Sequence, residues 1–398
     1  MGEGIAQPED QRFMAAAIRL SRRHLGRTAT NPSVGCVIVR DGFIVGRAVT
    51  ALGGRPHAEP QALAEAGELA RGATAYVTLE PCSHHGKTPP CAEALIAYGV
   101  SRVVISVTDP DIRVSGRGIS MLRNAGIEVT TGVLEEEGRR SLAGYLTRQT
   151  KNRPYVTLKL AVSADGMIGR EGAGQVAITG PQARAQVQAL RAETDAILVG
   201  IGTAISDDPL LTVRTPGLEA QSPVRIVLDP LLALPLTSKL VQTAREVPVI
   251  VVASEEVSLL RADAEGLPPS ALPGISPTSG RAEEGVPPTD VGIQTRGTAL
   301  EAAGVEIVYC SPYHPDVLLP ALATRGISSL LIEGGAKTAK LFLEADLVDR
   351  IQLYQSPIVI GDGGIESPLQ ATDIPSGFAH RGTYMFGADR LDEYEREN

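Results

Sequence analysis

Two short motifs hold residues whose types and spacing could support metal chemistry. His57-Ala58-Glu59 supplies an imidazole and a carboxylate, and the segment 81–91 (PCSHHGKTPPC) supplies the thiols of Cys82 and Cys91. Zinc in a catalytic site takes three such protein ligands and keeps its fourth position for water. We therefore expect His57, Cys82 and Cys91 to bind Zn²⁺, and Glu59 to move protons to and from the water.

The spacing of these residues is typical of zinc-dependent deaminases of amino-heterocycles. Their signature is His-x-Glu followed by Pro-Cys-x-x-Cys, whereas eight residues separate Cys82 from Cys91 here. A disulfide is disfavoured, because the chain has only four cysteines and its polar N-terminal segment lacks the apolar run of a signal peptide. A structural zinc site with His84 or His85 as fourth ligand remains open. That alternative leaves Glu59 without a role.

The composition is that of a globular protein. A chain of 398 residues is long enough for two domains. Hydrophobic residues make up 43% of it and charged residues 21%, which is enough apolar material for a packed core. A net charge of −9, with no basic run and no tryptophan, argues against nucleic-acid binding. No apolar run reaches the roughly 18 residues of a membrane span. Thiols that serve as metal ligands fit the reducing cytoplasm.

Alternating helices and strands are expected in the first part of the chain, which predicts a layered α/β domain. The motifs fall at its element ends: His57 opens a helix, strand 75–79 leads to Cys82, and Cys91 begins helix 91–98. This arrangement would hold the ligands on a rigid frame. The other expected elements are helices at about 9–23 and 119–125, a hairpin of strands 34–39 and 43–45 around an Asp-Gly turn, and strands 102–107 and 127–130.

A polar segment, 148–154, predicts a linker between a domain at 1–147 and another at 148–398. The second domain repeats the α/β pattern. Its expected strands lie at 155–161, 196–199, 224–228, 249–253, 328–332 and 350–355, and its expected helices at 181–192 and about 338–345. The segment at about 259–300, much of it rich in Pro, Gly, Ser and Thr, predicts a mobile surface insertion without chemistry.

Two glycine-containing turns in the second half are candidate nucleotide sites. The turn at 200–205 follows a strand but lacks the third glycine of the dinucleotide fingerprint. The turn at 333–338 (EGGAKT) opens a helix whose first N–H groups could hold a phosphate, although Ala336 excludes a P-loop. Tight connections between strands and helices explain such glycines equally well. Arg191 and Arg214 are candidate phosphate ligands or else solvated surface residues.

The whole chain resembles the bifunctional deaminase/reductase family of riboflavin biosynthesis. The resemblance rests on the motifs Asn31-Pro32-x-Val34-Gly35, Pro56-His57-Ala58-Glu59, TLEPCSH at 78–84, GKTPPC at 86–91, Ser163-x-Asp165-Gly166, DDPLLTVR at 207–214 and Glu333-Gly334-Gly335. The long spacing between the two cysteines is the family's own form. The resemblance implies an α/β protein with an N-terminal cytidine-deaminase-like three-layer domain and a C-terminal dihydrofolate-reductase-like α/β domain.

The resemblance also implies two successive reactions. Zinc on His57, Cys82 and Cys91, with Glu59 as proton shuttle, would deaminate a diaminopyrimidinone that carries a ribosylamino phosphate. NADPH would then reduce the ribosyl side chain to ribityl. The expected partner is thus a phosphorylated pyrimidine in the cytoplasm, and a homo-oligomer is compatible with the sequence.

The resemblance assigns further site residues by position. The deaminase substrate positions are Asn31, Lys87 and Thr88. The NADP positions are Ala161, Thr203, Asp207, Gly335, Ala336, Lys337, Thr338, Ala339, Lys340 and Leu341. The reductase substrate positions are Arg191, Leu211, Arg214 and Glu333.

Two alternatives stand beside this interpretation. One is a zinc deaminase of another nucleobase-like substrate with an inactive reductase domain, against which the 86–90 loop and the 207–214 block argue. The other is a zinc-stapled binding module without turnover, which would not need the unliganded Glu59.

Overall fold

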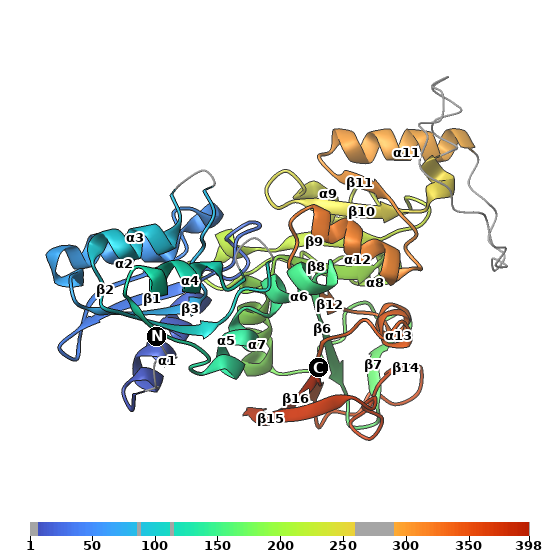
Figure 1. Cartoon of the computed structure of the whole chain (residues 1–398). Helices are drawn as coiled ribbons and strands as arrows, with labels where there is room; N and C mark the ends of the chain where they lie inside the picture. Colours follow the sequence, from blue (N-terminus) through green and yellow to red (C-terminus); the bar gives the residue numbers. More distant parts are fainter. Residues whose placement is uncertain (1–6, 86–88, 112–114, 259–289, 398) are drawn as a thin grey trace. The chain divides into compact units, whose positions relative to one another are not determined.

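The computed structural model describes residues 7–85, 89–111, 115–258 and 290–397. The chain forms two compact units (Figure 1): the first comprises Met1–Tyr155, Ala192–Asp195 and Pro320–Leu330, and the second comprises the rest. No helix of the described residues is long and apolar enough to cross a membrane.

A five-stranded sheet forms the centre of the first unit, in the order β2-β1-β3-β4-β5. Its strands are β1 (Gly35–Arg40), β2 (Phe43–Val49), β3 (Thr74–Leu79), β4 (Arg102–Val107) and β5 (Glu128–Thr130). Strand β1 runs antiparallel to β2 and β3, whereas β3, β4 and β5 are parallel. The central strands are apolar almost throughout because helices cover both faces.

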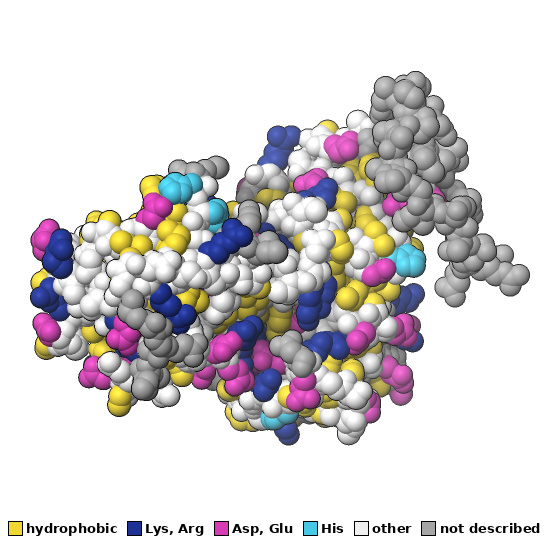
Figure 2. All heavy atoms as spheres, in the orientation of Figure 1, with side chains coloured by type: hydrophobic (Ala, Val, Ile, Leu, Met, Phe, Trp, Pro, Cys, Tyr) yellow, Lys and Arg dark blue, Asp and Glu magenta, His cyan; other side chains and the backbone are white. Residues whose placement is uncertain are grey.

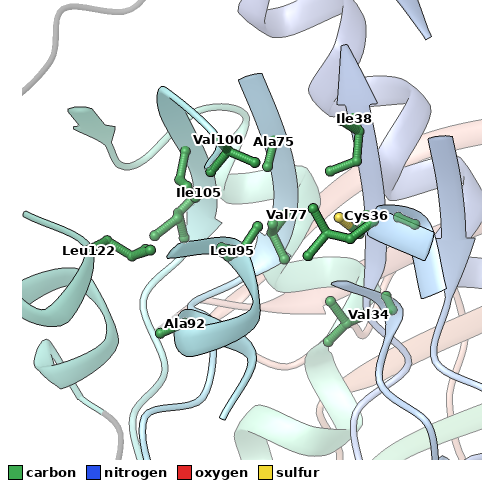
Figure 3. Close-up of a cluster of buried hydrophobic side chains, with 14 of the residues drawn as sticks. Val34, Cys36, Ile38, Ala75, Val77, Ala92, Leu95, Val100, Ile105 and Leu122 are labelled. Atoms are coloured by element: carbon green, nitrogen blue, oxygen red, sulfur yellow. The ribbon is translucent and has the colours of Figure 1, made fainter. Parts of the chain in front are cut away.

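Helices on both faces of this sheet give the three layers. The first-unit helices are α1 (Asp10–Ser21), α2 (Ala58–Ala66), α3 (Cys91–Tyr98), α4 (Arg117–Asn124), α5 (Glu135–Ser141) and α6 (Ala143–Lys151). On one face, α2, α3 and α4 pack on Cys36, Val77 and Ile105 in the larger core (Figure 3). On the other face, α1 packs Phe13 and Met14 against the sheet and contacts α5. The predicted layered domain is confirmed.

The predicted linker, 148–154, begins inside helix α6, which continues through Lys151. The leading segment of the first unit ends at Tyr155, directly after this linker, and the predicted domain limits stay a prediction. The polar residues occupy the outer face of an amphipathic helix. On its inner side, Thr147 is buried and Tyr145 and Leu146 pack on the larger core.

A nine-stranded sheet forms the second unit, in the order β11-β10-β9-β8-β12-β6-β13-β16-β15. Its strands are β6 (Tyr155–Val162), β8 (Ala196–Gly200), β9 (Val224–Leu228), β10 (Val249–Ala253), β11 (Glu306–Tyr309), β12 (Ser329–Glu333), β13 (Arg350–Gln355), β15 (Phe378–Phe386) and β16 (Asp389–Arg396). Strands β8 to β11 are parallel, as are β6 and β13, and β15 and β16 form an antiparallel hairpin. Two short strands, β7 (Met167–Arg170) and β14 (Gly364–Glu366), pair separately.

The helices that follow α6 along the chain are α7 (Pro181–Ala192), α8 (Ile201–Asp207), α9 (Lys239–Gln242), α11 (Asp290–Ala302), α12 (Pro315–Thr324) and α13 (Ala336–Glu344). Only α7 and α13 were predicted from the sequence, and α8, α9, α11 and α12 were missed. Helix α8 occupies the predicted glycine turn at 200–205. Helix α11 occupies the end of the predicted insertion, where Leu300 is buried in the core beside Val305. The rest of that prediction, 259–289, lies outside the described residues.

On the face shown in Figure 2, basic and acidic side chains of the described residues are interspersed, and no extended basic patch is visible among them.

Candidate metal centre and cofactor site

The three predicted metal ligands converge in the first unit. The ligand atoms of His57, Cys82 and Cys91 all lie within 4.8 Å of one another. His57 Nδ1 is 3.3 Å from Cys91 Sγ and 3.7 Å from Cys82 Sγ. Zn–S and Zn–N bonds of about 2.3 and 2.0–2.1 Å in a tetrahedron place sulfur and nitrogen about 3.6 Å apart. The side chains therefore fit a zinc ion as they stand.

The cluster has three ligands among the described residues, not four. His84 and His85 are exposed, and His85 Nε2 lies 3.5 Å from a carboxylate oxygen of Glu93. A structural site with one of these histidines as fourth ligand is not what the structure shows. Cys82 and Cys91 are free thiols, so the disulfide alternative is also absent.

Each ligand is placed by the end of a secondary-structure element. His57 is the N-cap residue of α2, Cys82 follows β3, and Cys91 is the first residue of α3. The N–H of Cys91 donates to Cys82 Sγ at 3.3 Å, and the N–H of Ala92 donates to the Cys82 carbonyl at 3.2 Å. The first turn of α3 thus holds both the backbone and the sulfur of Cys82, where the helix dipole favours a thiolate.

Hydrogen bonds among the ligands favour one thiolate even in the metal-free protein. The pKa of Cys82 is lowered to about 4, first by the Cys91 thiol and then by His57 and the N–H of Cys91. The pKa of Cys91 is raised, because its proton is shared with Cys82 and because it is buried. The pKa of His57 is raised chiefly by its hydrogen bond to Cys82. The cluster thus combines a thiolate with an imidazole, and these are the kinds of donor that zinc prefers.

Glu59 lies beside the ligands without being one of them. It is in the first turn of α2 and only 4% exposed, and its carboxylate contacts Cys91. Its pKa is raised, first by burial and then by the charge of Cys82. His57 Nδ1 faces the thiols, and its buried Nε2 has no hydrogen-bond partner among the described residues. These positions agree with a metal on Nδ1 and a separate carboxyl for proton transfer.

The predicted substrate positions of this half are only partly described. Asn31 lies against the turn at Gly54, where an added Cβ would come within 2.4 Å of Asn31 Nδ2. Lys87 and Thr88 lie outside the described residues. One titratable residue that the sequence analysis missed is Asp109, two residues after the end of β4. Burial raises its pKa to about 6, and the Tyr145 hydroxyl donates to it.

In the second unit, the two glycine-containing segments meet. Thr203 Oγ1, in α8, accepts a hydrogen bond from the N–H of Gly335 at 3.1 Å. A Cβ added to Gly200 would lie 2.5 Å from Thr338 Oγ1, so only glycine allows this approach. Gly335 is the N-cap residue of α13, and no side chain caps that end. Free N–H groups at a helix start form an anion site.

The other predicted cofactor residues lie in β6, α8 and α13. Among the residues of the α13 N-terminus, Thr338 and Ala339 are buried, whereas Lys337 and Lys340 are exposed. Asp207 ends α8, and Ala161 lies in β6. Ala336 and Leu341 are half-buried in α13. The structure therefore groups Thr203, Gly335 and the start of α13. The role of these residues in binding the cofactor stays a prediction.

A buried ion pair occupies the ends of β12 and α7. Arg191 Nε and Nη2 lie 2.7 and 2.8 Å from the two carboxylate oxygens of Glu333, and Arg191 Nη1 donates to the Thr212 carbonyl. Burial alone would raise the pKa of Glu333, but Arg191, Lys159 and Arg214 hold it below its usual value. Three cations thus surround one carboxylate, and this excess of positive charge suits an anionic ligand.

Leu211, one of the predicted substrate positions, has its side chain buried in the core and its backbone at φ 55°, and its role stays a prediction. Lys159 was missed: it lies in β6 with its Nζ 5.7 Å from the centre of the Tyr354 ring, and burial lowers its pKa. A lysine within an otherwise apolar strand was the available signal.

Comparison with known proteins decides the family. Residues 7–107 match the cytidine and deoxycytidylate deaminase zinc-binding region, and residues 154–383 match the RibD C-terminal domain. The riboflavin biosynthesis protein RibD of Aquifex aeolicus is 39% identical over 354 residues, or 89% of this chain and 88% of the relative. The chain belongs to the RibD family. The Escherichia coli RibD protein is 37% identical over 364 residues, or 89% of each chain.

Solved RibD structures share the whole fold. Acinetobacter baumannii RibD has a TM-score of 0.79 at 33% identity, covering 98% of this chain and 99% of its own. A Thermotoga maritima deaminase/reductase has a TM-score of 0.78 at 33% identity, covering 97% and 98%. The α/β fold and the combination of a zinc deaminase with an NADPH-dependent reductase are therefore confirmed.

Proposed function

We propose that the chain deaminates a diaminopyrimidinone ribosylamino phosphate and then reduces its ribosyl side chain with NADPH. The Thermotoga relative is described as a diaminohydroxyphosphoribosylaminopyrimidine deaminase and 5-amino-6-(5-phosphoribosylamino)uracil reductase. The observation that carries the proposal is the group of three zinc ligands with a fourth, unliganded carboxyl beside it. This group suits hydrolysis rather than metal storage.

In the deamination step, His57, Cys82 and Cys91 would hold the metal and Glu59 would move the protons. Zinc held there would supply a water activated at neutral pH for attack on the amino-bearing ring carbon. Glu59 would take one proton of the attacking water and pass it to the ring nitrogen, and would then carry the second proton to the amino group, which leaves as ammonia as the carbonyl forms. Because Glu59 is buried, bulk water does not compete for these protons. Asn31, Lys87 and Thr88 are proposed to bind the substrate.

In the reduction step, the second unit mainly positions two ligands. The start of α13 and Thr203 would hold the NADPH pyrophosphate, with Ala161 and Asp207 at its flanks. The cations around Glu333, which include Arg191, Lys159 and Arg214, would hold the substrate phosphate and sugar. Hydride transfer needs no covalent residue, because it depends on the distance and orientation of the two reactants.

Product analysis tests the proposal directly. Purified protein would be incubated with the diaminopyrimidinone ribosylamino phosphate, with and without NADPH. We expect ammonia in both samples, and the ribityl product with NADPH oxidation only in the second. Ammonia release without reduction of the deaminated product would instead support a deaminase with an inactive second domain. Absence of both reactions from zinc-loaded protein would refute the proposal.

We also infer that the protein works in the cytoplasm and that its two halves, predicted as 1–147 and 148–398, carry separate sites. Free thiols at the metal centre agree with a reducing compartment. A homo-oligomer remains an expectation, which light scattering coupled to size-exclusion chromatography would test.

A further inference from the structure

Glu80, at the end of β3, is a buried carboxylate without a cationic partner among the described residues. It is 3% exposed. Its oxygens accept four backbone hydrogen bonds: Oε1 from the N–H groups of Gly118 and Ile119 at 3.0 and 3.3 Å, and Oε2 from those of Gly116 and Asp109 at 3.1 and 3.4 Å. A buried carboxylate is costly unless its charge is matched in this way. Glu80 therefore caps α4 from another element.

The same residue is joined to the metal centre through two peptide units. Cys82 follows Glu80 after Pro81, and the Pro81 carbonyl packs directly on the first turn of α4. A Cβ added to Gly118 would lie only 2.1 Å from the Pro81 oxygen. On its other side, the Cys82 carbonyl accepts the N–H of Ala92 in α3. Cys82 is therefore held between two helix starts, and Glu80 makes the attachment to one of them.

We propose that Glu80 is a positioning residue of the zinc centre, which fixes Cys82 by binding the start of α4. A zinc site tolerates errors of only about 0.2 Å in its ligand distances. An amide at this position would turn an NH₂ group toward N–H donors and would lose about half of the hydrogen bonds. The end of β3 would then move relative to α4, and Cys82 would move with it. Residues that orient metal ligands typically affect metal affinity by roughly 10–100-fold.

A purely structural cap would give a different result, and Asp10 offers the matched control. Asp10 is another fully buried carboxylate of the same unit, bound by Arg102 at 2.7 and 2.8 Å and by the Tyr76 hydroxyl. It belongs to α1, on the sheet face opposite α2, α3 and α4. Asp10→Asn should therefore destabilise the domain without disturbing Cys82.

The experiment measures zinc affinity by competition with a chromophoric chelator, at a temperature where circular dichroism shows each protein to be folded. We expect Glu80→Gln to weaken zinc binding by roughly 10–100-fold and Asp10→Asn to leave the affinity unchanged while lowering Tm. Wild-type affinity in Glu80→Gln, or an equal loss in both variants, would overturn the proposal.

A second variant keeps the test decisive if Glu80→Gln does not fold. Gly118→Ala changes no charge but pushes the Pro81 carbonyl away from α4. Gly118→Ala should also weaken zinc binding, because a displaced Pro81 moves the adjacent Cys82, as the loss of the Glu80 hydrogen bonds would. A folded Gly118→Ala protein with wild-type zinc affinity would show that the contact does not position the ligand, and the proposal would fail.

Discussion

Glu59 and Glu80 are both buried and close in sequence to zinc ligands, but their surroundings are opposite. Glu80 accepts four backbone N–H groups, so the protein itself satisfies its charge. Glu59 faces the sulfur atoms of Cys82 and Cys91, and burial raises its pKa. A carboxylate whose lone pairs are all engaged holds structure, whereas one placed beside the reacting position can exchange a proton.

Replacing one thiol at the metal centre should remove the metal. Cys82→Ser or Cys91→Ser leaves two of the three ligands, because a neutral hydroxyl is a poor zinc donor. We expect loss of both zinc and ammonia release, measured by elemental analysis and an ammonia assay. Cys310→Ser is the control: it alters a buried cysteine of the second unit and should keep both. Full ammonia release by zinc-free protein would contradict the assignment.

Glu59→Gln should separate catalysis from metal binding. The amide keeps the shape of the side chain but cannot cycle a proton. We expect zinc content and Tm to be retained and the deamination rate to fall by roughly 10²–10⁴-fold. Steady-state ammonia release and elemental analysis on the same sample measure both quantities. If the variant instead lost its zinc, Glu59 would be a ligand.

The motif residues could be identified from the sequence because their chemical types are rare and their spacing is specific. Three ligands and a spare carboxyl are recognisable from their order along the chain, and the fold brings the three ligands together. Lys159 and Glu80 could not be interpreted in this way. Each is a single charged residue within or beside an apolar strand, and its role depends on partners far along the chain.

Among the elements, those with strong patterns were predicted well. Helix α3 and strand β4 begin and end where the sequence indicated, because an apolar run is bounded there by Pro90, Gly99 and a polar turn. The β15–β16 hairpin was missed, since most of β15 is exposed or half-buried and shows no clear alternation. Helix α8 was missed because Gly200 and Gly202 suggested a turn.

A pH-dependent contact joins Asp109, two residues after β4, to α6. The Tyr145 hydroxyl, in α6, donates to both oxygens of Asp109 at 3.1 Å, and burial raises the pKa of Asp109 to about 6 from an ordinary 3.8. A raised folded-state pKa contributes stability below pH 3.8 that is lost as the pH rises to about 6. The full loss corresponds to roughly 3 kcal/mol.

Asp109→Asn removes this titration. Thermal melts at several pH values should therefore show the stability of the variant, relative to wild type, increasing between about pH 4 and pH 6 and constant above that. Its altered contact with Tyr145 adds an offset that does not depend on pH in this range. A difference in Tm between the two proteins that is flat from pH 4 to pH 7 would contradict the raised pKa.

At the scale of the whole chain, each compact unit has its own core and its own candidate site. Substituting Arg214 should therefore affect only reduction. The guanidinium adds to the positive charge around Glu333, and a charge-assisted bond to a phosphate contributes about 1.5–3 kcal/mol. Arg214→Ala should weaken the reductase step by roughly 10–100-fold in kcat/KM, with ammonia release unchanged.

NADPH oxidation with the deaminated intermediate supplied directly measures this effect, and an ammonia assay on the same preparation is its control. Glu59→Gln provides the reciprocal case, because it should block ammonia release and leave NADPH oxidation intact. If Arg214→Ala slowed both reactions equally, the two sites would be coupled and the division into independent halves would be too simple.

The hydrogen bond between Thr203 and Gly335 has a consequence for folding. It joins residues 132 positions apart, so the cofactor site exists only after β8 and β12 have both taken their places in the sheet. Contacts of such long range form slowly and late. Residues 259–289 lie within this loop, yet doubling a loop's length adds only about 0.6 kcal/mol to the entropy of closing it. NADPH should therefore bind only to chains that have completed this sheet, and its binding would stabilise them against unfolding.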